Sequence, residues 1–140
     1  MRFQQWIIKA MTAATTGFLL MVAPAMAHHS STPFYDRDKP VEVEGVVTKF
    51  VFRNPHAALF IDVTDANGAT TEWQVELGAP VSLRRNGWTP DTLPVGMIIR
   101  VGGPSSRVEG SHGILGRRLT KPDGSPIVTG GRVEDSTPIR

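Results

Sequence analysis

Apolar and polar residues alternate along three segments in the first half of the chain, residues 41–51, 56–64 and 70–77. Alternation with a period of two is typical of strands that bury one face. Gly45 interrupts the first segment and is a candidate for a bulge or bend. The residues expected to point inward are Val41, Val43, Val47, Val51, Leu59, Ile61, Val63, Trp73, Val75 and Leu77. We therefore predict three strands that share one core.

The second and third strands are joined by a turn signal, Asp-Ala-Asn-Gly, at residues 65–68. Their inward faces meet the same core only if the loop has an odd number of residues. A three-residue loop over 66–68 places Gly68 last, where a left-handed backbone is favoured. That register sets Asp62 opposite Glu72, two carboxylates that repel unless a cation or solvent screens them. The pattern predicts an acidic outer face.

The second half of the chain predicts a helix and further strands. Residues 79–87 fit one short helix, with a proline in its first turn and a glycine as its stop. A fourth strand follows over 97–101, then a Gly- and Ser-rich loop over 102–113 and a final hairpin over 114–129. This element order is that of an OB-type barrel. We predict an all-β fold, a small OB-like barrel of five to six strands with one short helix between strands 3 and 4. Another small all-β barrel or a sandwich is the alternative.

The N-terminal segment has a different character. Residues 1–27 combine positive charge at Arg2 and Lys9 with a mostly apolar stretch over 10–23 and a small-x-small triplet that ends at Ala27. These features are typical of a secretory signal peptide, and the apolar stretch is shorter than the about 20 residues of a membrane span. No Arg-Arg pair precedes the stretch, which favours the general secretion route. We expect cleavage after Ala27 and a periplasmic product without a membrane anchor; an uncleaved anchor is the alternative.

The predicted product consists of an extended N-terminal arm (28–40), an OB-like barrel domain (41–129) and a flexible C-terminal tail (130–140). Of the 15 basic residues two lie in the signal, which leaves 13 basic against 13 acidic residues. This balance argues against a nucleic-acid-binding protein, which normally carries a basic patch. The absence of cysteine excludes disulfides, thiolate metal sites and a cysteine nucleophile.

Four short motifs follow one another in an order that resembles a known family. They are His28-His29-Ser30, Asn54-Pro55-His56-Ala57, Glu76-Leu77-Gly78-Ala79-Pro80 and Arg85-Asn86-Gly87-Trp88. The chain resembles, over residues 28 to about 103, a family of short exported bacterial proteins classed only as a domain of unknown function. The resemblance implies a periplasmic setting and a small β fold, and it brings no established activity.

The histidines are the most concrete candidates for chemistry. Cleavage after Ala27 would leave His28 with a free α-amine beside its imidazole, and the two nitrogens can chelate one metal ion. A third nitrogen would complete a site that suits copper(II). His56, which follows an Asn-Pro turn, is the best third ligand. His29 is adjacent but would point away in an extended chain, and His112 lies on the predicted loop. The alternative is a polar, metal-free chain end and a turn histidine.

A second candidate is the outer face of the second and third strands, where OB folds usually bind ligands. The predicted ligand face comprises Phe60, Asp62, Glu72, Gln74 and Glu76, with Phe50 and Phe52 nearby. Its three carboxylates would repel a phosphate backbone. A cation, a sugar or a protein partner fits better. The alternative is that the three phenylalanines pack under the helix or the arm.

Sequence signatures of enzymes are missing. The chain has no G-x-S-x-G elbow, no phosphate-binding glycine loop and no H-E-x-x-H motif. We predict an exported, non-catalytic binding protein whose most concrete ligand is copper(II). The alternatives are an interaction or structural adaptor of an envelope complex without metal and an oxidase or monooxygenase that uses the same metal.

Overall fold

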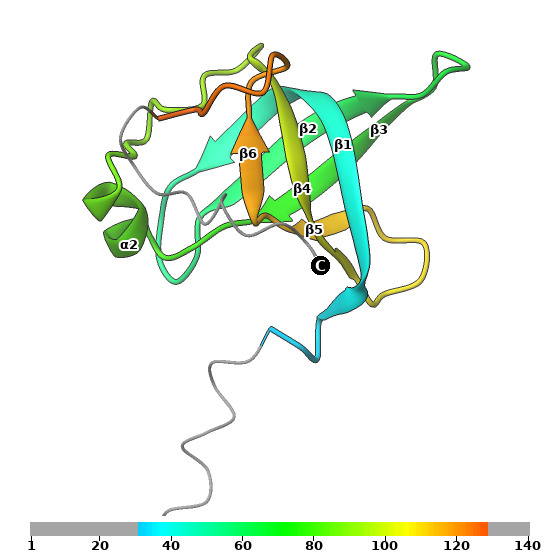
Figure 1. Cartoon of the computed structure of the whole chain (residues 1–140), viewed down its shortest axis with the longest axis horizontal. Helices are drawn as coiled ribbons and strands as arrows, with labels where there is room; N and C mark the ends of the chain where they lie inside the picture. Colours follow the sequence, from blue (N-terminus) through cyan, green and yellow to red (C-terminus); the bar gives the residue numbers. More distant parts are fainter. Residues whose placement is uncertain (1–30, 129–140) are drawn as a thin grey trace, which may run out of the picture. The chain divides into compact units, whose positions relative to one another are not determined.

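The computed structural model describes residues 31–128 and contains six strands and one helix in this part of the chain (Figure 1). They are β1 (Tyr35–Val51), β2 (Ala58–Thr64), β3 (Thr70–Glu76), α2 (Pro80–Arg85), β4 (Ile98–Ser106), β5 (Gly113–Leu115) and β6 (Arg118–Thr120). The predicted signal peptide (1–27) and the whole predicted C-terminal tail (130–140) lie outside the described residues. Within residues 31–128 no helix has the length and apolar character of a membrane span.

The strands close into a barrel. Their order is β1-β2-β3-β5-β4-β6, and β1 also pairs with β4, which completes a ring of five strands. β5 and β6 follow one another along the edge of β4 that β1 leaves open, so β6 is the extra strand. β3 and β5 run parallel, whereas the other pairs are antiparallel. With α2 between β3 and β4, this is the OB-like barrel that the sequence predicts.

The hairpin of β2 and β3 confirms the predicted register. Asp62 lies opposite Glu72, and the chain reverses through a three-residue loop that ends at Gly68, whose φ is +84°. The Asp65 carboxylate accepts hydrogen bonds from the backbone N–H groups of Asn67 and Ala69, at 2.8 and 2.9 Å. The turn residues therefore determine locally which side chains face outward.

β1 is longer than predicted and changes phase within its length. It begins at Tyr35, six residues before the predicted start, so part of the predicted arm belongs to the sheet. A bulge lies between Val47 and Lys49, beyond Gly45. Gly45 instead allows a close approach, because a Cβ there would lie 2.7 Å from the Asp62 carbonyl oxygen.

The bulge overturns one prediction about the core. One extra residue on the strand reverses which side chains point inward. Phe50 and Phe52 therefore pack against the core, and Val51 does not. The Phe50 ring lies edge-on to Phe52 at 5.5 Å and to Trp88 at 6.3 Å between centroids. These two partly buried phenylalanines pack against the core and are not part of the ligand face.

β4 corrects a second prediction, because its strand continues through Ser106 where a loop was expected from residue 102. Gly102 and Gly103 are buried. A Cβ on Gly103 would overlap the Leu115 carbonyl oxygen. These glycines allow two backbones to approach closely, which is a role that glycine has in strands as well as in loops.

The final hairpin predicted over 114–129 is reduced in the structure to a single bridge between Thr120 and Pro126.

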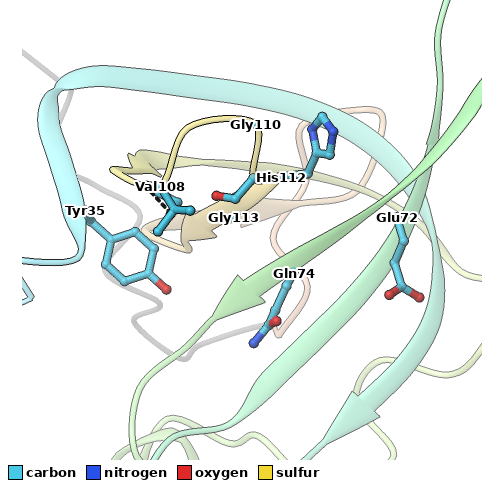
Figure 2. Close-up of a pocket in the computed structure, with 9 residues that line it drawn as sticks. Tyr35, Glu72, Gln74, Val108, Gly110, His112 and Gly113 are labelled. Carbon is cyan, nitrogen blue, oxygen red and sulfur yellow. Dashed lines mark hydrogen bonds between the residues drawn. The ribbon is translucent and has the colours of Figure 1, made fainter.

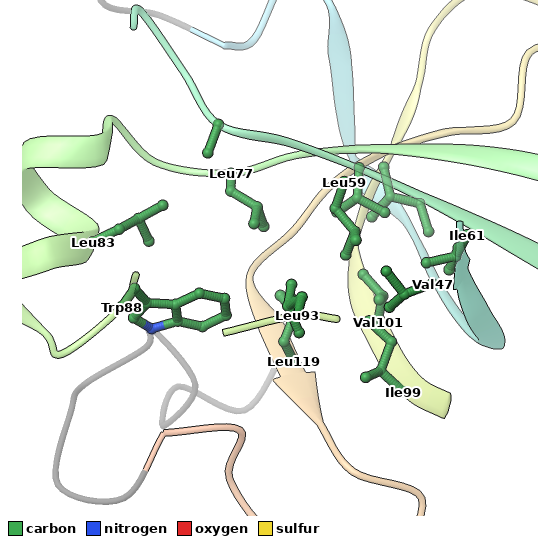
Figure 3. Close-up of a cluster of buried hydrophobic side chains, with 13 residues drawn as sticks. Val47, Leu59, Ile61, Leu77, Leu83, Trp88, Leu93, Ile99, Val101 and Leu119 are labelled. Carbon is green, nitrogen blue, oxygen red and sulfur yellow. The ribbon is translucent and has the colours of Figure 1, made fainter. Parts of the chain in front are cut away.

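The core fills the barrel and extends under α2 (Figure 3). Its largest fully buried side chains are Trp88, Leu59, Ile61, Leu93, Ile99, Ile114 and Leu119. α2 contributes Leu83 and Pro80, and the chain leaves the helix at Gly87, whose φ is +84°. Among the described residues no polar or charged residue is buried. All candidate chemistry is therefore on the outside of the barrel.

Candidate functional site

One carboxylate on the outer face joins three separate segments of the chain. Glu76, at the end of β3, accepts a hydrogen bond from the Tyr35 hydroxyl at 2.8 Å through Oε2. Its Oε1 lies 2.6 Å from Nδ1 of His56 in the loop between β1 and β2. The start of β1, the β1–β2 loop and the end of β3 therefore meet at Glu76. We call this set, Tyr35, His56 and Glu76, the Glu76 network.

Burial and the contact with Glu76 both raise the pKa of Tyr35. Partial burial of the phenol raises its pKa, and the hydrogen bond to Glu76 and the negative charge of that carboxylate raise the pKa further. Tyr35 is therefore a hydroxyl donor throughout the physiological pH range. Nδ1–H of His56 donates to the other carboxylate oxygen, and His56 Nε2 has no hydrogen bond to the described residues.

A groove of about 530 Å³ lies beside the Glu76 network (Figure 2). It is lined by Tyr35, Glu72, Gln74, Ser106, Val108, Gly110, Ser111, His112 and Gly113. We call this space the β4–β5 groove, because residues 107–112, which connect β4 to β5, form one of its walls. In OB folds this loop and the loop between the first two strands flank the usual ligand face.

The loop that forms this wall is held at both of its ends. At the first end, the Arg107 N–H donates to the Phe34 carbonyl at 2.9 Å, and the Arg107 guanidinium lies 3.2 Å from the Asp36 carboxylate. At the other end, the His112 carbonyl accepts from the Gln74 N–H at 2.9 Å. These contacts shape the groove before any ligand binds, which lowers the ordering cost of binding.

Comparison with known proteins identifies the family. A model of a family of unknown function, DUF6152, matches residues 17–115. The chain belongs to this family. A search of curated proteins found no match. Among solved structures, the chain is similar to the mitochondrial single-stranded DNA-binding protein Rim1 of S. cerevisiae, at a TM-score of 0.44 and 8% identity. That similarity covers 59% of this chain and 91% of Rim1.

The predicted ligand face of this DUF6152 protein lies on the outer side of β2 and β3, but its residues do not form one site. Glu72 and Gln74 line the β4–β5 groove, and Glu76 is joined to it through Tyr35. The remaining two do not line the groove: Phe60 lies under the Lys49 ammonium, 5.5 Å from the ring centroid, and Asp62 lies opposite Glu72.

The predicted metal ligands are only partly described. His28 and His29 lie outside the described residues, and His56 is on the surface with Glu76 as its partner. Between residues 31 and 128 no three histidine, aspartate or glutamate side chains are grouped so that they could hold a metal ion. A metal at His56 would therefore need ligands from elsewhere in the chain.

Sequence reasoning did not predict the groove in the DUF6152 chain and missed most of its lining, including Tyr35, Ser106 and Ser111. Tyr35 lies in the predicted arm and the two serines lie in the predicted loop, where His112 is considered above only as a metal ligand. The predicted OB order contains a usable signal, since the loop before the last barrel strand flanks the ligand face in this fold. The pairing of Tyr35 with Ser106, which are distant in sequence, leaves no local signal.

Proposed function

We propose that this DUF6152 protein is an exported, non-catalytic binding protein that holds copper(II) between His56 and the amino-terminal His28. One observation carries the proposal. Glu76 binds His56 through one carboxylate oxygen and Tyr35, near the start of the described chain, through the other. The histidine and the segment that leads to the N-terminus therefore meet at one carboxylate.

His56 has the partner that a metal-binding histidine usually has. Ligating histidines commonly donate the second ring N–H to a carboxylate, which fixes the tautomer and the ring orientation. The contact of 2.6 Å between Nδ1 and Glu76 has this arrangement and leaves Nε2 for an ion. In this proposal Glu76 positions His56 and is not itself a ligand.

His28 would supply the remaining nitrogens. It precedes Tyr35 by seven residues, a length of chain that spans up to about 25 Å when extended. The α-amine, with an ordinary pKa of about 7.7–8.0, loses its proton readily to a metal near neutral pH. Two nitrogens from His28 and one from His56 form a set that favours copper(II) over other divalent ions.

The test is a copper(II) titration of the exported protein, with His28 verified as the first residue by intact mass. We expect one site per chain, and affinity at least tenfold lower both for His56→Ala and for a protein with one glycine added before His28. Glu76→Gln should weaken binding about 10- to 100-fold, as loss of the carboxylate that orients a ligating histidine does. His112→Ala is the matched control and should bind normally. Unchanged affinity in the extended protein would contradict the proposal.

A metal-free adaptor of an envelope complex is the second candidate. It is supported by Phe34 and Val108, two apolar side chains that are each 68% exposed. They lie close together, because the N–H of Arg107, next to Val108, bonds to the Phe34 carbonyl. A photo-crosslinker at position 34 should capture a partner in the periplasm, with the same yield in the presence of a chelator, if this candidate is correct.

A further inference from the structure

The β4–β5 groove has the volume and the shape of a small-molecule site. Its 530 Å³ fall within the range of about 300–1,000 Å³ that is typical of ligand pockets. The groove is distinct from the site of the copper proposal, because His56 is not among the described residues that line it. An inference about the groove therefore goes beyond that proposal and does not rest on it.

The chemistry of the lining changes from one end of the groove to the other. Tyr35 and Val108 lie together and present an aromatic ring and an aliphatic side chain (Figure 2). The other side chains of the described lining are polar: the Gln74 amide, the Glu72 carboxylate, the His112 imidazole and the hydroxyls of Ser106 and Ser111. A ligand that fits both ends has an apolar face and an edge rich in hydroxyl groups, as a sugar ring does.

The charge of the lining restricts the ligand further. No lysine or arginine is among the described residues that line the groove. The nearby Arg107 guanidinium lies 3.2 Å from the carboxylate of Asp36. A phosphate or another anion would therefore meet the Glu72 carboxylate in the groove and no lysine or arginine to balance its charge, which argues against a nucleic-acid backbone as the ligand.

The Glu72 carboxylate favours a ligand that carries a positive charge. It forms no ion pair with the described residues and lies directly opposite Asp62 on the neighbouring strand. Like charges in this arrangement repel each other, and an ammonium group between Glu72 and the groove would reduce the repulsion. The ammonium would donate to acceptors that are already present, the Glu72 carboxylate and the Gln74 amide oxygen.

We propose that the β4–β5 groove binds an amino-sugar disaccharide, with one ring against Tyr35 and Val108 and the ammonium of the other ring at Glu72. Neutral sugars of the same size would use the same hydroxyl contacts but lack the charge-assisted hydrogen bond. Binding is expected in the absence of metal, because none of the proposed contacts involves a metal ion.

The test uses the exported protein in the presence of a chelator and two probes, the β-1,4-linked glucosamine disaccharide and its di-N-acetylated form. At pH 6 the free-amine sugar should bind about fivefold more tightly, the size of a partly exposed ion pair. Amide NMR signals of Ser111, His112 and Gly113 should shift. Glu72→Gln should make the two affinities equal, whereas Asp123→Asn, in a turn outside the groove, should preserve the difference.

A blocking variant keeps the test decisive. Ser111 is exposed on the loop, so Ser111→Trp should leave the barrel folded and abolish binding of both sugars. His56→Ala should bind them normally, which separates this outcome from the copper proposal. Equal affinity of the two probes for the unaltered protein, binding unaffected by Ser111→Trp, or a dissociation constant weaker than about 10 mM would overturn the proposal.

Discussion

The two faces of the β2–β3 hairpin are built from alternate residues of the same strands and have opposite properties. On the inner face Leu59, Ile61 and Val75 are fully buried and contact only the core. On the outer face Gln74 lines the β4–β5 groove and Glu76 joins two polar side chains. Stability therefore depends mainly on one set of side chains and ligand chemistry on the other. Substitutions on one face should leave the properties of the other largely intact.

The largest expected effect is at the closure of the barrel, at Gly103. Gly103→Ala places a Cβ where the Leu115 carbonyl oxygen lies, and backbone atoms must move. We expect a loss of about 3 kcal/mol or more in the free energy of unfolding. Gly78→Ala is the control, because a Cβ there would meet Leu83 at an ordinary 3.9 Å. Chemical denaturation of both variants gives the answer; equal stability would mean that the strands are not so closely apposed.

Neighbouring residues on β2 provide the next test. Leu59→Ala removes a fully buried side chain and should cost about 3 kcal/mol. Phe60→Ala removes the larger side chain, but from the outer face, and should cost about 1 kcal/mol through lost cross-strand contacts. Urea unfolding of the two variants measures the difference. If Phe60→Ala were the more destabilising, the assignment of the two faces would be wrong.

A smaller effect is expected from the Glu76 network. Tyr35→Phe removes a hydrogen bond of the network and should reduce stability by about 1 kcal/mol. Because the folded-state pKa of Tyr35 is raised, its contribution is fully present below about pH 10, the ordinary pKa. The contribution is lost as the pH rises through the folded-state value. Above pH 10 the free energy of unfolding of Tyr35→Phe should therefore fall less with rising pH than that of the unaltered protein.

Tyr35 is the only tyrosine in the chain, so the shift can be observed directly. The absorbance of the phenolate, followed as the pH is raised, therefore reports the ionisation of Tyr35 alone. In the folded protein the absorbance should appear well above pH 10, and Glu76→Gln should move it toward the ordinary value. A midpoint near 10 in the unaltered folded protein would show that Tyr35 is not bound to Glu76.

The sequence predicted those parts of the fold that local rules determine. Alternation and one turn sufficed for the β2–β3 register, including Asp62 opposite Glu72, and so for the outward position of Glu76. Two predictions were wrong for physical reasons. An extra residue in β1 reversed which side chains of the strand point inward. Gly103 allows two backbones to approach closely within β4, where the Gly- and Ser-rich composition of residues 102–113 had suggested a loop.

The candidate site was predictable to a lesser extent. His56 and the outer residues of β3 follow from local pattern, but their partner Tyr35 does not. Tyr35 reaches Glu76 because β1 pairs with the far end of β4, at Ser106. Such a pairing depends on the closure of the whole barrel and leaves no mark in the sequence near Tyr35.

The central claim, that copper(II) binds where the Glu76 network holds His56, can be tested by paramagnetic broadening. A substoichiometric amount of copper(II) is added to the ¹⁵N-labelled protein that begins at His28, and amide signals near the ion disappear. We predict loss of signals around His56 and Glu76, while those around the control residue His112 persist. Broadening centred on His112, or weak broadening without a centre, would contradict the claim.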